Sequence, residues 1–302
     1  MAELTASQLE RLAQRRTPTR KSRGLLLGIL AYGAIGLAVA VASGVIGIVV
    51  AKGLPAIDWA FLSEPPVDGM SAGGIWPMIR GSILLLLGTL VLAPVLGIAS
   101  GIWMAEYLKE NRVGQAVRVL VMTLAGTPSI VFGLFGLAIF VLKMGIGFSL
   151  IAGWLTLAIM SVPVVALTTE QAIRTVPHSF AEAGVGLGLS RWQVIRKILL
   201  PGALPGILTG LVLAAGRAAG EAPPILLTAG LYYSTEKLTL SWETLKRPVA
   251  NLPYHLAEGY RQGGVIPEKI IWGTCFVLMA LVLLVNLMAI IARSRTRGKR
   301  QW

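Results

Sequence analysis

Cysteine, histidine and charged residues are scarce in this chain of 302 residues. The one cysteine, Cys275, excludes an intrachain disulfide and a metal site built from several cysteines. The two histidines, His178 and His255, lie far apart and offer no ligand cluster. Charged residues make up 14% of the chain, about half of their share in soluble domains. These absences argue against a disulfide-rich secreted protein and against an ordinary cytosolic enzyme.

The chain also lacks a nucleotide-binding loop. No Gly-x4-Gly-Lys-Ser/Thr sequence occurs, and the one Gly-Lys pair, Gly298-Lys299, is followed by Arg300. No Ser/His/Asp set or carboxylate dyad is placed for catalysis. We therefore expect a chain that is not itself an enzyme and holds no cofactor.

Apolar residues are abundant instead, at 55% of the chain with a mean hydropathy of +0.74. A soluble fold of this size cannot bury so much apolar surface, so the composition indicates a polytopic membrane protein. Six uncharged runs are long enough to cross about 30 Å of hydrocarbon as helices. They cover residues 24–51, 81–105, 119–142, 144–169, 198–216 and 270–292. The sequence predicts an all-α fold with six transmembrane helices.

The net charge of +13 is explained by basic loops rather than by a nucleic-acid partner. With the N-terminus inside, the cytoplasmic segments hold 18 Lys and Arg residues and the outer segments hold 8. This bias predicts that both termini are cytoplasmic. We expect a basic N-terminal segment over 1–23, a membrane domain over 24–292, and a basic tail over 293–302 beside anionic lipid. The first 23 residues form either a short surface helix or a disordered segment.

Small residues recur at the spacing of helix contacts. The pairs Gly97/Gly101, Gly206/Gly210 and Gly216/Gly220 each follow the Gly-x3-Gly pattern. Such pairs let two helices approach closely. They predict a packed bundle and indicate no particular function.

The loop 170–203 carries local signals for two short helices. Ser179 with Glu182 has the form of a capping box, and Gly188 can end the first helix in a left-handed conformation. Ser190 with Gln193 is a second box, and the helix after it is expected to stop at Leu200-Pro201. By physics alone, this segment fits an interfacial amphipathic helix and a protein docking element equally well.

A motif in this loop favours docking. The pattern is Glu182-Ala183-Gly184-x3-Gly188-x9-Ile198-x-Leu200-Pro201. It resembles the EAA motif of ABC-importer permeases, with Gly184 in place of the second alanine. In that family the motif is the coupling helix, which inserts into a groove of the cytoplasmic ATPase. The resemblance implies that residues 179–201 bind an ATPase dimer, which itself binds ATP and Mg²⁺.

Other stretches resemble one branch of that family, the phosphate permeases of the PstA kind, over about residues 25–292. They are Gly73-Gly74-Ile75-Trp76-Pro77, Pro128-Ser129-Ile130-Val131-x-Gly133-Leu134, Arg217-Ala218-Ala219-Gly220-Glu221-Ala222-Pro223 and Ala250-Asn251-Leu252-Pro253-Tyr254. The resemblance implies a type I ABC-importer permease bundle (MetI-like) in the bacterial cytoplasmic (inner) membrane. It also implies two further partners, a PstC-like second permease subunit and a phosphate-binding protein. That protein would meet the outer loops, where Trp242 and Tyr254 are either contacts or interface anchors.

Two opposite charges, Arg217 and Glu221, lie well inside the fifth run. Arg217 follows Pro205 by twelve residues, about 18 Å along a helix and near the midplane. A charge at that depth is costly and marks a function by default. The planar guanidinium suits an oxyanion such as phosphate, and the carboxylate weakens a site that would otherwise bind too tightly. The alternative is a buried ion pair that only fixes helix packing. Pro223-Pro224 predict that the helix kinks or ends just beyond Glu221.

Thr127, Pro128 and Ser129 lie at a similar depth in the third run. The hydroxyls of Thr127 and Ser129 could line the same path. We favour the alternative, in which the proline kinks the helix and the hydroxyls bond their own backbone.

Together these features predict the permease subunit of an ATP-driven importer that carries inorganic phosphate across the membrane. The nearest alternative is the same architecture for sulfate, molybdate or phosphonate. A proton-coupled secondary transporter that uses Glu221 is less favoured, because it has no use for a coupling motif.

Overall fold

The computed structural model describes residues 18–108, 110–231, 242–261, 264 and 266–297. The chain forms two compact units, residues 1–52 and 53–302. The described part of the first unit is residues 18–52 of helix α2 (Pro18–Gly53), so residues 18–23 of the basic N-terminal segment are helical. The sequence left a surface helix and disorder as alternatives for the first 23 residues, and residues 1–17 of these lie outside the described residues.

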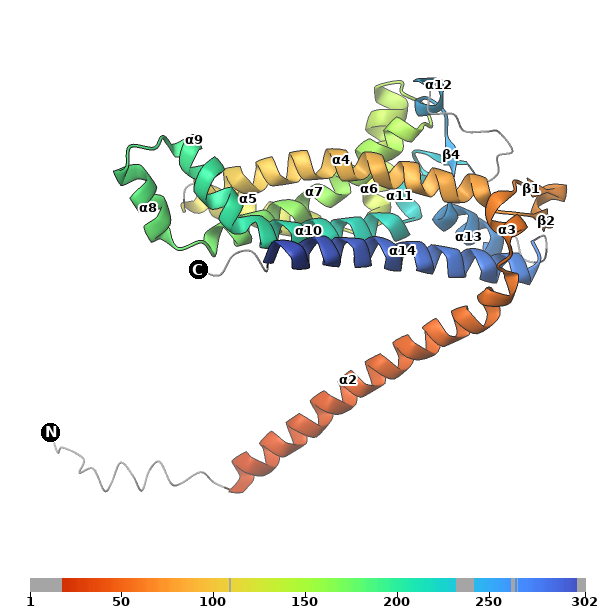
Figure 1. Cartoon of the computed structure of the whole chain (residues 1–302), viewed down its shortest axis with the longest axis horizontal. Helices are drawn as coiled ribbons and strands as arrows, with labels where there is room; N and C mark the ends of the chain where they lie inside the picture. Colours follow the sequence, from red (N-terminus) through yellow and green to blue (C-terminus); the bar gives the residue numbers. More distant parts are fainter. Residues whose placement is uncertain (1–17, 109, 232–241, 262–263, 265, 298–302) are drawn as a thin grey trace. The chain divides into compact units, whose positions relative to one another are not determined.

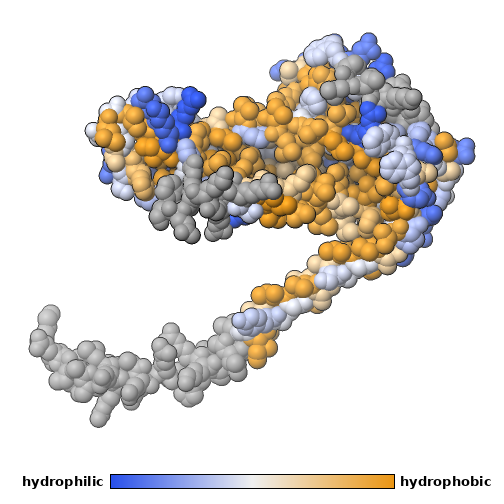
Figure 2. Space-filling view, viewed as in Figure 1, coloured by the Kyte–Doolittle hydropathy of each residue, from blue (hydrophilic) through white to orange (hydrophobic). Residues whose placement is uncertain are grey.

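The second unit is a helical bundle. Helices α4 (Trp76–Glu106), α7 (Leu150–Arg174), α10 (Leu200–Gly220) and α14 (Glu268–Arg297) run beside one another (Figure 1). Within the described residues five helices, α2 among them, are long and apolar enough to cross a membrane, and a bent pair raises the number to six. Figure 2 shows apolar residues over the middle of the bundle and hydrophilic residues at its two ends. This distribution fits a membrane-spanning unit.

The bent pair occupies the third predicted span. Helix α5 (Arg112–Ala125) is followed by α6 (Ser129–Gly136) and by the π-helical segment η3 (Leu137–Lys143), with a bend of 97° between them. The run 119–142 is therefore not one straight helix, and the kink predicted at Pro128 is confirmed. Pro128 has no N–H to donate and disfavours helical geometry at Thr127, so the helix breaks there.

Glycines bring the long helices close together. A Cβ on Gly97 would lie 2.6 Å from the Cβ of Val165, and one on Gly210 would lie 1.8 Å from the hydroxyl of Thr168. Both partners belong to α7. Gly101 and Gly206 approach α7 in the same way, so two of the three predicted pairs are contact surfaces. In the third pair, Gly216 packs against Asn286 of α14, whereas Gly220 has open space.

The core of the bundle lies between α4, α6, α7 and α11 (Pro223–Leu226). Its largest fully buried side chains include Leu85, Leu150, Leu157 and Met160. Helix α7 begins where the Ser149 hydroxyl accepts a hydrogen bond from the Ala152 N–H.

Short elements cover one end of the bundle. After η1 (Leu54–Ala56) and α3 (Trp59–Ser63), strands β1 (Pro66–Val67) and β2 (Ala72–Gly73) pair antiparallel around the turn η2 (Asp68–Met70). Strand β3 (Gly230–Leu231) pairs parallel with β4 (Val249–Ala250), and α12 (Trp242–Leu245) and α13 (Leu252–Arg261) complete this end.

The opposite end carries the loop that contains the predicted coupling motif. It folds into α8 (His178–Gly186), α9 (Arg191–Val194) and the π-helical segment η4 (Ile195–Leu199). Gly188 has φ of +82° and closes α8 as predicted, and the capping box of Ser190 and Gln193 is present. The capping box predicted for Ser179 and Glu182 does not form, because the N-cap of α8 is Pro177, two residues before Ser179.

The predicted stop at Leu200-Pro201 is wrong. One continuous span runs from Arg191 to Gly220. The turn before Pro201 is widened to π geometry, and the Leu200 N–H donates to the Ile195 carbonyl five residues back. A wider turn relieves the clash that a proline ring makes with the carbonyl four residues before it, so the helix continues.

Candidate functional site

Arg217 and Glu221 form an ion pair at the end of α10. Arg217 Nε donates to Glu221 Oε1 at 3.1 Å, and the two side chains are 32% and 16% exposed. Arg217 Nη1 also donates to the Ala125 carbonyl at 3.4 Å. This carbonyl ends α5, where helical carbonyls lack partners within the helix and carry partial negative charge. The guanidinium is thus shared between a carboxylate and the break in the bent pair.

Helix α10 ends one residue before Glu221. Glu221 is extended, with φ of −80° and ψ of 126°, and Pro223 opens α11 just after it. The chain therefore leaves helical geometry at Glu221, as the two prolines predicted. The carboxylate reaches back to the arginine from a non-helical backbone.

Thr127 and Ser129 flank Pro128 in the break. The Thr127 hydroxyl donates to the Thr123 carbonyl at 2.9 Å, as expected of a hydroxyl that bonds its own backbone. Thr127 also lines an apolar cavity of about 530 Å³ between α4, α5, α6 and α7. Ser129 is half-buried at the first residue of α6. Arg217 reaches this break through Ala125, two residues before Thr127.

The coupling-motif residues divide into a buried and an exposed group. Gly184 is buried, and a Cβ added there would lie 2.7 Å from Cδ1 of Ile198. Gly184 therefore suits this position because α8 packs closely on η4. Leu200 and Pro201 are half-buried at the start of α10, whereas Glu182, Ala183 and Gly188 are exposed.

Large apolar side chains stand exposed on the same segment. Val185 is 62% exposed, Leu187 84% and Trp192 58%. Exposed apolar groups of this size, gathered on one short segment, mark an interaction surface. The segment is tied to the bundle by Arg191, which donates to the Glu106 carbonyl and lies over the Tyr107 ring at 4.9 Å.

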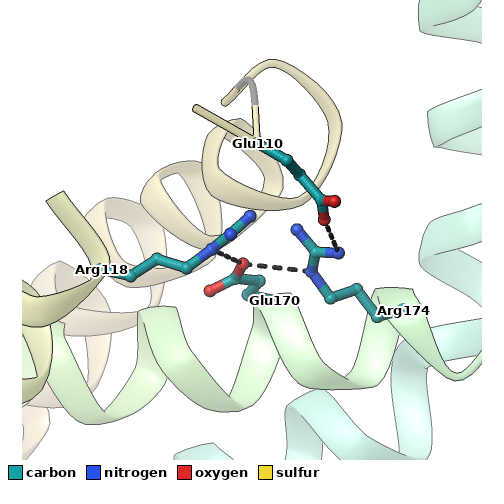
Figure 3. Close-up of polar contacts among 4 residues, drawn as sticks. All are labelled: Glu110, Arg118, Glu170 and Arg174. Atoms are coloured by element: carbon teal, nitrogen blue, oxygen red, sulfur yellow. Dashed lines mark hydrogen bonds and ion pairs between the residues drawn. The ribbon is translucent and has the colours of Figure 1, made fainter. Parts of the chain in front are cut away.

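A second charged cluster was missed in the sequence. Glu170 lies inside α7 and its side chain is 6% exposed, although the sequence placed it in the loop 170–203. Arg118 of α5 and Arg174 of α7 donate to the same oxygen, Oε1, at 2.7 and 3.1 Å, and Arg174 also pairs with Glu110 (Figure 3). The i,i+4 spacing of Glu170 and Arg174 was a signal, but Arg118 is 52 residues away in sequence.

The opposite end is organised by polar groups around Asn251. Its side-chain oxygen accepts from the Tyr254 N–H at 3.0 Å, and the Ser82 hydroxyl accepts from the Leu252 N–H at 2.8 Å. His255 is buried, and burial lowers its pKa to about 4. Tyr254 packs against Gly230, and Trp242 is 66% exposed under Lys246. Residues 232–241 of this outer region lie outside the described residues.

No cluster of three or more His, Cys, Asp or Glu side chains that could hold a metal ion occurs in the part of the chain that the structure describes. Helix α14 continues to Arg297, so residues 293–297 of the predicted tail 293–302 are helical, and 298–302 lie outside the described residues.

Known proteins with similar folds are subunits of ABC transporters. A chain of a bacterial alginate ABC transporter, solved with an alginate-bound periplasmic protein, superposes with a TM-score of 0.63 at 17% identity, over 93% of this chain and 98% of that one. A chain of the MetNI methionine ABC transporter gives a TM-score of 0.57 at 21% identity, over 74% and 97% of the two chains. These likenesses confirm the predicted fold class.

Relatives found by sequence have a higher identity to this chain than these solved structures have. The probable ABC transporter permease protein YqgI of Bacillus subtilis (strain 168) is 36% identical over 86% of this chain and 92% of its own. The phosphate transport system permease protein PstA of Yersinia pestis is 34% identical over 95% and 94%. The family described as binding-protein-dependent transport system inner membrane component matches residues 97–297. The ABC transporter permeases YqgI and PstA are thus similar to this chain over most of its length. The chain belongs to this family of multi-pass inner-membrane permeases.

Proposed function

We propose that this chain is the permease subunit of an ABC importer for inorganic phosphate. The observation that carries the proposal is the Arg217–Glu221 pair at the break of the bent pair, in a chain 34% identical to a PstA protein. The guanidinium is one-third exposed, so its donors are accessible to a passing anion.

The pair suits a protonated oxyanion. Guanidinium donors match the oxygens of phosphate. Monohydrogen and dihydrogen phosphate also carry protons, which they can donate to the Glu221 carboxylate, whereas fully ionised sulfate has none. Glu221 competes with the anion for Arg217, which keeps binding weak enough for release. The site therefore favours phosphate over sulfate.

The test is uptake of labelled phosphate in cells that lack this chain and receive the wild type or Arg217→Gln. We expect the wild type to restore uptake. Loss of a charge-assisted hydrogen bond, worth about 1.5–3 kcal/mol, should lower uptake by Arg217→Gln at least ~10-fold at equal membrane content. Arg112→Gln is the matched control, since Arg112 is exposed at the start of α5. Unlabelled sulfate and molybdate should not compete.

Three outcomes contradict the proposal in different ways. Normal uptake by Arg217→Gln makes the arginine a packing residue. Competition by sulfate or molybdate indicates the same architecture with another oxyanion. Uptake that depends on a proton gradient and not on ATP indicates a secondary transporter.

We infer that α8, α9 and η4 dock a cytoplasmic ATPase dimer, which binds ATP and Mg²⁺ and carries out the hydrolysis. The exposed side chains of Val185, Leu187 and Trp192 support this, together with the motif residues Glu182 and Ala183. The excess of basic residues in the predicted cytoplasmic segments supports the same orientation, with both termini in the cytoplasm.

Co-purification tests the docking surface. Leu187→Asp should lose the ATPase subunit, because a charge replaces an apolar contact. Val67→Asp is the control, since Val67 is an exposed aliphatic residue at the opposite end of the bundle. Retention of the ATPase by Leu187→Asp would contradict the assignment.

The remaining partners are proposed on the family resemblance. A PstC-like second permease would complete the pore, and a phosphate-binding protein would deliver substrate at the end that carries α3, α12 and α13. Exposed Trp242 is a candidate contact there, whereas half-buried Tyr254 packs within this chain.

A further inference from the structure

Helix α5 has few apolar contacts to hold it. Gly114 is its one buried residue. Val119, Leu120 and Met122 are 60%, 63% and 53% exposed. A helix with so little buried apolar surface gains little from packing on the bundle. Its position depends on a small number of polar contacts.

The first of these contacts is the pairing of Arg118 with Glu170. The distance from Arg118 Nε to Glu170 Oε1 is 2.7 Å, and the acceptor side chain is 6% exposed (Figure 3). Glu170 also holds Arg174 of its own helix, so the carboxylate is fixed to α7. A short, charge-assisted bond to a fixed and shielded carboxylate sets where α5 lies on α7.

The second contact lies at the end of the same helix. The Ala125 carbonyl accepts from Arg217 Nη1 at 3.4 Å, while Arg217 Nε holds Glu221. Ala125 follows Arg118 by seven residues, about two turns or 10 Å along α5. A shift of α5 at Arg118 therefore moves the carbonyl that shares the Arg217 guanidinium.

We propose that Arg118 and Glu170 are positioning residues for the Arg217 anion site, and that they act through α5. The proposal rests on the proposed function for the role of Arg217. The Glu170 carboxylate on α7 fixes the Arg118 guanidinium on α5, and the end of α5 then orients the Arg217 guanidinium on α10.

The competing explanation is that the cluster only stabilises the bundle. Arg118→Gln separates the two, because Glu170 keeps Arg174 and no buried carboxylate is left without a cation. Arg118→Lys is the conservative variant, which retains the charge. Arg112→Gln is the matched control, an exposed arginine on the same helix.

Two measurements are made on each variant in the assembled transporter. One is phosphate uptake per molecule in the membrane. The other does not depend on phosphate: it is the labelling rate of Thr127→Cys by a water-soluble thiol reagent, in a chain whose Cys275 is replaced by serine. Thr127 lies two residues beyond Ala125, so its reactivity reports the position of the end of α5.

We expect Arg118→Gln to lower uptake per molecule at least ~5-fold, since small displacements of a reacting group have large effects. We also expect it to change the labelling rate at least ~3-fold, because α5 loses the charge-assisted contact that fixes it on α7. Arg118→Lys should restore part of both, and Arg112→Gln should change neither.

An unchanged labelling rate would overturn the inference, because the end of α5 would not depend on Arg118. Altered labelling with normal uptake would also overturn it, since the position of α5 would not matter to Arg217. If the wild type imports no phosphate, the proposed function fails, and the labelling result still decides whether Arg118 positions the end of α5.

Discussion

At the end of the bundle that carries α8 and α9, charged side chains join the helices, whereas at the opposite end neutral polar groups and backbone do so. Arg118 and Arg174 converge on Glu170 at the first end. At the second, Asn251 is fully buried and caps α13, and the backbone of Ala250 lies directly on Gly81. The difference follows from packing, because Gly114 is the one fully buried residue of α5, whereas five residues of α13 are buried. The charged contact of Arg118 with Glu170 therefore holds α5, which buries few of its own side chains.

The largest expected effect comes from removal of the central carboxylate. Glu170→Ala leaves two arginines beside a shielded position without their shared partner, and breaking a buried pair costs about 3–5 kcal/mol. Thermal unfolding of the purified protein measures this loss. Glu258→Ala at the opposite end should cost far less, because its partner Arg261 is 78% exposed and stays hydrated. Equal losses in the two variants would break the comparison.

The opposite end should respond to acid through His255. Burial lowers the pKa of His255 in the folded protein to about 4, below its usual value of 6.5. Between these two values the unfolded chain binds a proton and the folded chain does not, so stability falls as the pH drops through this window. The full loss is about 3 kcal/mol. His255→Gln should remove this share of the pH dependence in unfolding measurements from pH 7 to 4. An identical pH profile in the variant would contradict it.

One helix cap at each end of the bundle allows a direct comparison of cap strength. Asn251 caps α13 and is fully buried, whereas Asn111 caps α5 in the same way, through a bond to the Gly114 N–H at 2.9 Å, and is exposed. Asn251→Ala should cost about 2 kcal/mol and Asn111→Ala about 0.5 kcal/mol, the two limits for caps. Midpoints of chemical unfolding give both values. The reverse order would show that burial does not set the strength of these caps.

The smallest effect is expected for the rim of the charged cluster. The pair of Arg174 and Glu110 is 40% and 74% exposed. Glu110→Gln should change stability by less than about 1 kcal/mol, and raised salt should erase the difference. A larger, salt-independent loss would mean that the whole cluster, and not Glu170 alone, holds this end.

Local chemistry predicted some features of the coupling loop and misjudged others. The Ser190–Gln193 box and the left-handed Gly188 depend on neighbours in sequence, and both are present. The predicted stop at Pro201 was wrong because a π-helical turn accommodates the proline within the helix. The predicted Ser179 capping box was wrong because α8 begins before Ser179. In both cases the packing of η4 and α8 on their neighbours competes with local signals.

The membrane character, the helical segments and the Arg217–Glu221 pair were readable in the sequence by itself, because hydropathy and i,i+4 spacing are local properties. Pro128 predicted a kink in the third run, but only the tertiary structure decided that the bend is 97° and that Arg217 reaches the carbonyl at this bend. It also decided that Glu170 joins α7 to α5 through Arg118. These contacts join residues 52 and 92 positions apart, and such pairings arise only when the packed helices bring the side chains together.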